Sequence, residues 1–254
     1  MTTAYAAADA NDRVSTRGGI LWQPVPELSL YGSYTENFGA SNTFSLASAT
    51  PLPPQTAQQW ETGAKTELFD GRLSATLAYF DLYKQNLPMD IAPGVKRAVG
   101  EAESRGIEFD FSGQVLPGLR LIGAYAYTPF AKTLKDNPGL GTVGMRLHNA
   151  PKHSGSLWAT YTFEGGDLNG LKLGAGVQGL SQREIGYTET AQVPGYAVFN
   201  LMTSKLWKIG KTNFTAQLNV DNLLDKTYIS HTYSYGPSYY GNPRTFMGSI
   251  KVEY

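Results

Sequence analysis

The chain has 254 residues, of which 41% are hydrophobic and 12% aromatic, and it contains 28 glycines and no cysteine. Because 21 basic residues balance 21 acidic ones, no patch of positive charge indicates a nucleic-acid partner. The absence of cysteine excludes disulfides and thiolate metal sites. The sequence contains no apolar run of about 18 residues, so it has no transmembrane helix.

The first residues read MTTAYAAADANDR (1–13). This segment lacks the basic region and the apolar region of a secretory signal peptide. We therefore expect either a cytoplasmic protein or a signal that lies upstream of this sequence.

Apolar and polar residues alternate along most of the chain, which is typical of half-buried β-strands. In the clearest case, KTNFTAQLNV (211–220), Phe214 and Leu218 lie on one face and Gln217 and Asn219 on the other. The segment 196–207 alternates poorly but still fits a strand. No segment has a sustained helical period, so the sequence predicts an all-β fold with eleven strands. The other segments that alternate include 27–34, 71–79, 105–113, 119–127, 171–177 and 245–254.

Short and long connections alternate between these predicted strands. The short ones are turns rich in Gly, Pro and Asp, at 24–27, 69–71, 116–118, 164–170 and 208–211. The long ones are 39–56, 87–103, 130–147, 183–193 and 222–242. An antiparallel up-and-down transmembrane β-barrel has this arrangement, with short turns at one rim and long loops at the other.

The predicted strand number raises a problem of closure. With eleven antiparallel strands, the first and the last run in the same direction, whereas single-chain bacterial barrels have even strand numbers. Residues 2–8 (TTAYAAA) could add a short twelfth strand. The interpretation we favour is that the chain is the C-terminal part of a longer barrel.

Several sequence blocks resemble one family. The most specific are WETGAKTELFDGRLSATLAYF (60–80) and NVDNLLDKTY (219–228), with further similarity over 18–39, 103–128 and 149–163. From about Val14 to Tyr254 the chain resembles the C-terminal half of the β-barrel of TonB-dependent outer-membrane siderophore receptors.

The resemblance implies a 22-stranded barrel in the bacterial outer membrane, closed by an N-terminal plug domain. It implies import of ferric siderophores with energy from the TonB complex. Residues 1–254 would be a partial barrel domain without plug, TonB box or signal peptide. The alternatives are a truncated half-barrel that does not transport, an independent 12-stranded pore or enzyme, and a soluble β-sandwich that binds a ligand.

The last strand carries a second expectation of the resemblance. In such barrels the assembly machinery recognises an alternating C-terminal strand that ends in an aromatic residue. Here that signal would comprise Phe246, Ile250, Val252 and Tyr254, with outer-membrane lipid beside them. The simpler interpretation is that an ordinary edge strand ends in tyrosine.

One long loop is the richest candidate for contact with a ferric siderophore. Tyrosine offers flat contact area together with a hydrogen-bonding hydroxyl. The alternative is that these tyrosines belong to an aromatic girdle or to loop packing. The candidates are Tyr228, His231, Tyr233, Tyr235, Tyr239, Tyr240 and Arg244.

Other polar residues receive structural interpretations. Arg183 and Glu184 are expected to be solvated loop charges, and DNLLDK (221–226) a structural strand exit rather than a cation site. A further set is expected to face the barrel lumen and, in a complete receptor, to contact the plug: Glu108, Asp110, Asn213, Gln217 and Asn219.

The sequence offers no catalytic constellation. The three histidines, His148, His153 and His231, are not part of an HExxH motif or a metal-spaced cluster. The chain also lacks GxSxG, P-loop and dinucleotide-binding motifs. We therefore expect no enzyme activity, no metal site and no cofactor.

Overall fold

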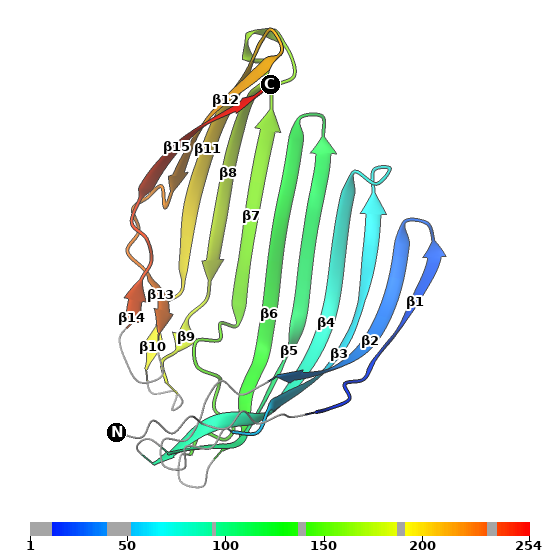
Figure 1. Cartoon of the computed structure of the whole chain (residues 1–254), viewed down its shortest axis with the longest axis vertical. Helices are drawn as coiled ribbons and strands as arrows, with labels where there is room; N and C mark the ends of the chain where they lie inside the picture. The colour runs from blue at the N-terminus through cyan, green and yellow to red at the C-terminus, as the bar shows by residue number, and fades with distance from the viewer. Residues whose placement is uncertain (1–11, 40–51, 93–94, 137–140, 187–190, 233–237) are drawn as a thin grey trace, which may run out of the picture.

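The computed structural model describes residues 12–39, 52–92, 95–136, 141–186, 191–232 and 238–254. Its main sheet has eleven strands, and each pairs in antiparallel fashion with the next (Figure 1). This confirms the predicted all-β fold and the predicted number of strands. The strands are β1 (Arg17–Val25), β2 (Leu28–Gly39), β3 (Gln55–Leu68), β4 (Leu73–Ala92), β5 (Val95–Leu116), β6 (Leu119–Lys135), β7 (His153–Thr162), β8 (Leu171–Leu180), β11 (Tyr196–Ile209), β12 (Thr212–Asp221) and β15 (Thr245–Glu253).

Two short hairpins and one helical turn complete the described elements. β9 (Arg183–Glu184) pairs with β10 (Gln192–Val193), and β13 (Ile229–Thr232) pairs with β14 (Ser238–Tyr240). A 3₁₀ turn, η1, spans Gly166–Leu168. Among the described residues, no helix is long and apolar enough to cross a membrane.

The short turns have the backbone conformation that their residues favour. Phe69, Asp70 and Gly71 follow one another with positive φ angles of 56°, 56° and 78° between β3 and β4. Gly118 and Gly210 also have positive φ, at 76° and 62°. Glycine adopts this region without steric cost, so these turns reverse the chain within a few residues and place neighbouring strands side by side.

The strand register separates an apolar face from a polar one. In β4 and β5, Leu77 lies opposite Phe109 and Tyr79 opposite Ile107. These four side chains are between 39% and 52% exposed, so this apolar face has no protein layer covering it. The same face carries further exposed apolar side chains on other strands: Trp22, Leu157, Leu173, Phe199, Leu218, Phe246 and Ile250.

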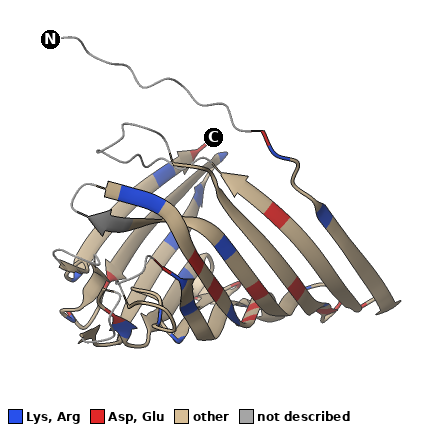
Figure 2. Ribbon diagram, turned by 90° about the horizontal axis from the view of Figure 1, so that it is seen from below, with Lys and Arg blue, Asp and Glu red and all other residues tan. Residues whose placement is uncertain are grey.

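The opposite face is concave and polar. A groove of about 770 Å³ runs along it and contacts every strand from β2 to β8 as well as β11. Glu108 and Asp110 line this groove together with Glu61 and Lys65, as expected for residues that face a lumen. Gln217 donates a hydrogen bond to Asn219 on the same side of β12 (3.1 Å). Figure 2 shows acidic residues on several neighbouring strands.

The prediction of a long loop at 87–103 is wrong. β4 continues to Ala92 and β5 begins at Val95, and the two remain paired through Leu87↔Gly100 and Met89↔Arg97 with register shifts between them. Past the apolar band neither face of this hairpin has to be apolar, so the alternation that marks a half-buried strand is lost there.

The two edge strands, β1 and β15, do not pair with each other in the described structure (Figure 1). They run in the same direction, because an odd number of strands lies between them and each strand is antiparallel to the next. Every residue of both strands is exposed. The sheet is therefore a partial barrel, and the possible extra strand at 2–8 lies outside the described residues.

Candidate functional site

The connection between β6 and β7 is held in place by Arg146. This side chain is only 7% exposed and donates hydrogen bonds of 2.7–3.0 Å to the backbone carbonyls of Thr128, Pro129, Ala150 and Pro151. A guanidinium carries five N–H donors in a fixed plane, so one side chain ties both ends of the loop together. His148 and Asn149 lie between the tied segments.

Arg183 joins three of the long connections at this rim. Its side chain is 2% exposed. Nη1 donates to Asn149 Oδ1 and to the carbonyl of Ser230, each at 2.9 Å, and Nη2 donates to the carbonyl of Ile229 at 2.7 Å. Burial lowers the pKa of the Arg183 guanidinium. The expectation that Arg183 is a solvated loop charge is therefore wrong.

Glu184 is also buried, which corrects the second half of that expectation. Its side chain is 7% exposed and Oε1 accepts a hydrogen bond from Gln192 Nε2 at 2.6 Å. Its backbone carbonyl accepts the N–H of Asn149 at 3.0 Å. Among the described residues, Glu184 Oε2 and Arg183 Nε have no hydrogen-bond partner. The pair thus fixes the loop at 149 through both backbone and side chain.

Two histidines meet beside this pair. Asn149 Nδ2 and His231 Nδ1 are 2.8 Å apart, and the rings of His148 and His231 are 6.3 Å apart and nearly perpendicular. Burial lowers the pKa of His148, and the charges of His231 and Arg183 act in the same direction. No group of three or more His, Asp or Glu side chains in the described ranges could hold a metal ion.

The contacts among His148, Asn149, Arg183, Glu184 and His231 form a loop cluster. A pair of tyrosines connects this loop cluster to the groove. The ring centres of Tyr196 and Tyr228 are 4.2 Å apart, and the Arg183 guanidinium lies 5.9 Å from the centre of the Tyr196 ring. Burial, followed by the charge of Tyr196, raises the pKa of Tyr228. A side chain at Gly241 would collide with the Tyr228 ring. Since Tyr196 also lines the polar groove, the cluster adjoins the groove.

The structure brings some of the predicted ligand residues together. The β13–β14 hairpin places His231 opposite Tyr239, and Tyr239 and Tyr240 are 50% and 72% exposed. Tyr228 is half-buried against Tyr196. Tyr233 and Tyr235 lie outside the described residues. The binding role of all seven candidates remains a prediction.

Arg244 stands apart from these contacts. Its backbone N–H donates to Asp225 Oδ1 at 2.8 Å, and its Nη1 approaches the carbonyl of Leu223 at 3.4 Å. Both partners belong to the strand exit after β12. Its observed contacts therefore tie the two ends of the 222–244 connection together.

The DNLLDK segment forms the structural strand exit that the sequence predicts. Asn222 is 3% exposed and has a positive φ of 50°. Its Nδ2 donates to the carbonyls of Lys226 and Asn242, and its Oδ1 accepts the N–H of Lys226. Asn200 Oδ1 accepts the Asn222 N–H. These contacts turn the chain out of β12.

The C-terminal strand presents its alternating residues on the apolar face. Phe246 lies opposite Val220, Ile250 opposite Ala216 and Val252 opposite Phe214. Ile250 is 78% exposed and Tyr254 fully exposed. This arrangement fits the predicted assembly signal, whose recognition stays a prediction.

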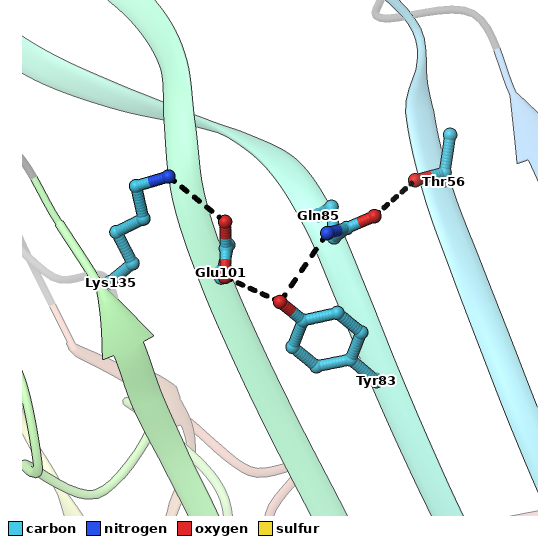
Figure 3. A network of polar contacts seen from close by, with 5 residues as sticks. All are labelled: Thr56, Tyr83, Gln85, Glu101 and Lys135. Atoms are coloured by element: carbon cyan, nitrogen blue, oxygen red, sulfur yellow. Dashed lines mark hydrogen bonds and ion pairs between the residues drawn. The ribbon is translucent and has the colours of Figure 1, made fainter.

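A polar network supports the extended ends of β3 to β6 (Figure 3). Thr56 donates to Gln85 at 3.4 Å, Gln85 donates to the Tyr83 hydroxyl at 3.4 Å, and Tyr83 donates to Glu101. Lys135 completes the network with an ion pair to Glu101 at 3.1 Å. The network links four strands beyond the apolar band and so stiffens this side of the rim.

Sequence reasoning missed the residues that organise the site, namely Arg146, Asn149, Arg183 and Tyr196. Each lies in or next to a long connection, where polar residues are ordinary. The sequence contains only weak indications of this site. HNAPKH (148–153) and the Arg183–Glu184 pair are unusual in composition, but neither indicates which residues it contacts. Only the folded sheet brings these segments together.

Comparisons with known proteins agree with this architecture. The family model "TonB dependent receptor-like, beta-barrel" matches residues 2–223. The metal–pseudopaline receptor CntO of Pseudomonas aeruginosa is 36% identical over 94% of this chain, and the ferrioxamine B receptor of Salmonella typhimurium is 30% identical over 94%. The chain spans about a third of each relative, 33% and 34% of their lengths.

A solved structure gives the same result. The ferric preacinetobactin receptor BauA of Acinetobacter baumannii superposes with a TM-score of 0.76 at 25% identity, covering 93% of this chain and 36% of that one. Family match, relatives and structure all describe one class of receptor barrel. The chain therefore belongs to the TonB-dependent receptor β-barrel family.

Proposed function

We propose that the protein containing this chain is an outer-membrane receptor that takes up ferric siderophores or related metal chelates. The named relatives support this, since they are receptors for metal–pseudopaline and for ferrioxamine B. Because the chain spans about a third of these relatives, the uptake activity is proposed for the whole protein. The proposed activity is transport, and no residue of this chain is assigned a catalytic role.

One observation carries the proposal most directly. Tyr196 lines the polar groove and also contacts Tyr228 and Arg183 in the loop cluster. A ligand bound among these loops would therefore lie next to the groove. His231, Tyr239 and Tyr240 would supply flat surface and hydrogen-bonding groups, which suit a bulky complex with an oxygen-rich shell.

The remaining parts of the pathway would come from segments outside this chain. We place the contact with the TonB complex there, because the family couples to TonB through the plug and its TonB box. Glu61, Glu108 and Asp110 on the groove wall would then face the plug. Carboxylates that an inserted domain covers need polar or cationic partners, so a plug with basic residues would satisfy them.

The apolar face would contact the hydrocarbon of the outer membrane. Its exposed Leu77, Phe109, Leu157 and Phe199 form a continuous surface that water does not favour, and antiparallel barrels solve this by facing lipid. We propose that β15, with Tyr254 at its end, is the strand that the barrel-assembly machinery binds during insertion.

The test is equilibrium binding by the full protein encoded by the natural gene, purified in detergent micelles. Ferric ferrioxamine B, a ferric pyoverdine and cobalt–pseudopaline are titrated while tryptophan fluorescence is followed. We expect saturable quenching by at least one of these complexes and much weaker quenching by its metal-free form. Absence of saturable binding with all three complexes would overturn the proposed cargo class.

A pair of variants locates the site. Tyr239→Ala with Tyr240→Ala removes two exposed rings from the loop hairpin and is expected to weaken binding by about tenfold, the effect of roughly 1.4 kcal/mol. Tyr161→Ala removes an exposed ring near the opposite rim and is the matched control. Equal affinities for both variants would place the ligand elsewhere.

A further inference from the structure

A second groove lies on the apolar face of the sheet, where β7, β8, β11 and β12 are neighbours (Figure 1). It is open, has a volume of about 580 Å³ and is lined almost entirely by apolar atoms. Ala159 and Ala175 lie opposite each other in it. Because a methyl group leaves space that a longer side chain would fill, the two alanines create the depression. The larger side chains around them are Leu119, Tyr161, Leu173, Leu201, Leu218 and Val220.

One cation interrupts this face on the side of the groove nearest the short turns. Lys205 follows Thr203, which lines the groove, by two residues on β11. Residues two apart in a strand point to the same face, about 7 Å from each other, and the pairing of Lys205 with Ala216 places it on the face of Leu218. Within β7, β8, β11 and β12, all of which the structure describes, Lys205 is the only Lys, Arg, Asp or Glu on that face. A charge on a lipid-facing surface is unfavourable away from the interface, so Lys205 marks the level at which this face meets headgroups.

The connection between β7 and β8 fixes the ammonium group of Lys205. Nζ donates to the carbonyl of Asn169 at 2.7 Å and to that of Asp167 at 3.3 Å. This connection is itself tied to β11, because the N–H of Leu206 donates to the carbonyl of Gly170 at 2.9 Å. An ammonium group has three N–H donors and no acceptor. The two carbonyls therefore leave one donor for an anionic oxygen.

Aromatic rings connect the groove to the ammonium group. Tyr161 lines the groove, and its ring meets the Phe163 ring edge to face, with 4.9 Å between the ring centres. Phe163 and Trp207 line a second depression, which also contains Lys205 and Glu164. Tyrosine and tryptophan suit the level where hydrocarbon meets headgroups, because their rings are apolar and carry one polar group. The two depressions thus form one path from an apolar surface to a fixed cation.

We propose that this surface binds one phospholipid of the leaflet at the short-turn rim, with an acyl chain in the groove beside Ala159 and Ala175 and a phosphate oxygen that accepts the third N–H of Lys205. This inference rests on the membrane contact in the proposed function and names the lipid that meets one part of the apolar face. The groove volume lies within the range of about 300–1,000 Å³ that is typical of small-molecule sites.

The charge of Lys205 favours a phospholipid over other occupants of the groove. A phosphate supplies the anion that complements a cation at the end of an apolar groove, and hydrogen bonds between such charged partners are strong. An uncharged apolar ligand would leave Lys205 without an anion. A second copy of the chain docked through the same face of these four strands would offer no carboxylate, because Lys205 is their only charged residue there.

Two substitutions test the two halves of the site separately. Lys205→Gln removes the charge and keeps a long polar side chain. Lys172→Gln is its matched control, because Lys172 lies at the same rim, opposite Ser204 on the other face of the sheet. Ala175→Leu fills the groove, while Ala197→Leu adds the same bulk on the same face but outside the groove. All four positions are exposed or half-buried, so each variant is expected to fold, which heat-modifiable mobility on electrophoresis checks.

The experiment is native mass spectrometry of the full protein, purified in detergent micelles, stripped of lipid and titrated with dioleoyl phosphatidylglycerol. Dioleoylglycerol, which has the same chains and no phosphate, is the comparison ligand and is expected to bind much more weakly. Lys205→Gln should weaken phospholipid binding by about tenfold, the effect of one hydrogen bond between charged groups. Lys205→Arg should retain the affinity. Ala175→Leu should weaken binding of the phospholipid as well, and both control variants should bind like the natural protein.

Equal affinity of Lys205→Gln and Lys172→Gln, or equal binding of the phospholipid and the diacylglycerol, would overturn the assignment of the phosphate to Lys205. Unchanged binding in Ala175→Leu would show that no acyl chain lies in the groove. A dimer of the natural protein that Ala175→Leu dissociates would assign the groove to a second copy instead.

None of these measurements uses a siderophore, so the two proposals fail separately. Lipid binding with the expected pattern, together with no binding of any ferric complex, would count against the proposed cargo alone. Binding of a ferric complex by a protein whose lipid affinity none of these substitutions changes would count against the lipid site alone.

Discussion

Arg183 Nη1 donates a hydrogen bond to Asn149 Oδ1 at 2.9 Å, although 34 residues separate the two in the chain. The same guanidinium reaches Ile229, 46 residues further along. Three connections that leave the sheet at different strands are thereby held by one side chain. The long-loop rim is held as one unit, because the Arg183 guanidinium is buried and its acceptors lie in different connections.

Arg183→Ala should loosen that unit without unfolding the sheet. It removes three hydrogen bonds from a charged donor and leaves two carbonyls without their partner, a loss on the order of 3 kcal/mol. Limited proteolysis of the full protein is expected to cut the 141–152 and 222–232 segments much faster. Arg120→Ala, which removes an exposed arginine beside the short turn at 116–118, serves as the control. Unchanged cleavage in Arg183→Ala would contradict the role of Arg183 as the hub.

Acidification should weaken the same cluster through His148. Burial lowers the pKa of His148 below its ordinary value of 6.5. The folded state therefore binds the proton less readily than the unfolded state, and stability falls as the pH drops below about 6.5. Hydrogen exchange of residues 146–150 and 183–186 is expected to accelerate between about pH 7.5 and pH 5.5 beyond the intrinsic pH effect. His148→Gln should remove this extra acceleration, and its persistence would point to another group.

Trp158 and Gly176 lie directly opposite each other on β7 and β8, and the indole covers the glycine so closely that a Cβ at Gly176 would overlap the ring. Gly176→Ala should destabilise the sheet by about 1–3 kcal/mol, as overpacking does. Adding Trp158→Leu should make Gly176→Ala much less costly. The measurement is urea unfolding of the refolded protein in micelles, with Gly165→Ala as control because nothing lies within 4 Å of its Cβ position. Additive effects would contradict the close approach.

The sheet could be predicted from the sequence because its physical cause is local. Leu218 and Gln217 must face opposite sides of β12, and a repeated two-residue period leaves few other folds. The turns at 69–71 and 116–118 were equally visible, since their glycines adopt positive φ. Beyond the apolar band this signal ends, which is why the sequence predicts a loop where Leu87 and Gly100 pair.

The site could be predicted only in part. An aromatic loop with His231 was evident from composition, and the Asn222 turn from its motif. The hub was hidden because Arg183 finds its acceptors at Asn149, Ile229 and Ser230, and no local pattern specifies a contact across such separations. The sequence around a buried arginine does not differ from the sequence around a solvated one. Only the folded positions of the surrounding loops show that Arg183 is buried.

The terminal strand gives a prediction about assembly. Tyr254→Ser removes a fully exposed aromatic ring at the end of β15 and should lower the amount of protein inserted in the outer membrane, because the proposed recognition needs that ring. Heat-modifiable mobility on electrophoresis of membrane fractions measures insertion. Tyr240→Ser, which changes an exposed ring in the loop hairpin, should insert normally. Equal insertion of both variants would argue against the assembly signal.

The most direct test of the account is hydrogen exchange of the full protein with and without its ferric complex. Binding at the long-loop rim should slow exchange together in the 146–152, 183–186 and 228–232 segments, while the metal-free siderophore should have little effect. In Arg183→Ala the protection should no longer extend to all three segments. Binding that protects none of them would contradict the proposal that this rim, organised by Arg183, receives the cargo.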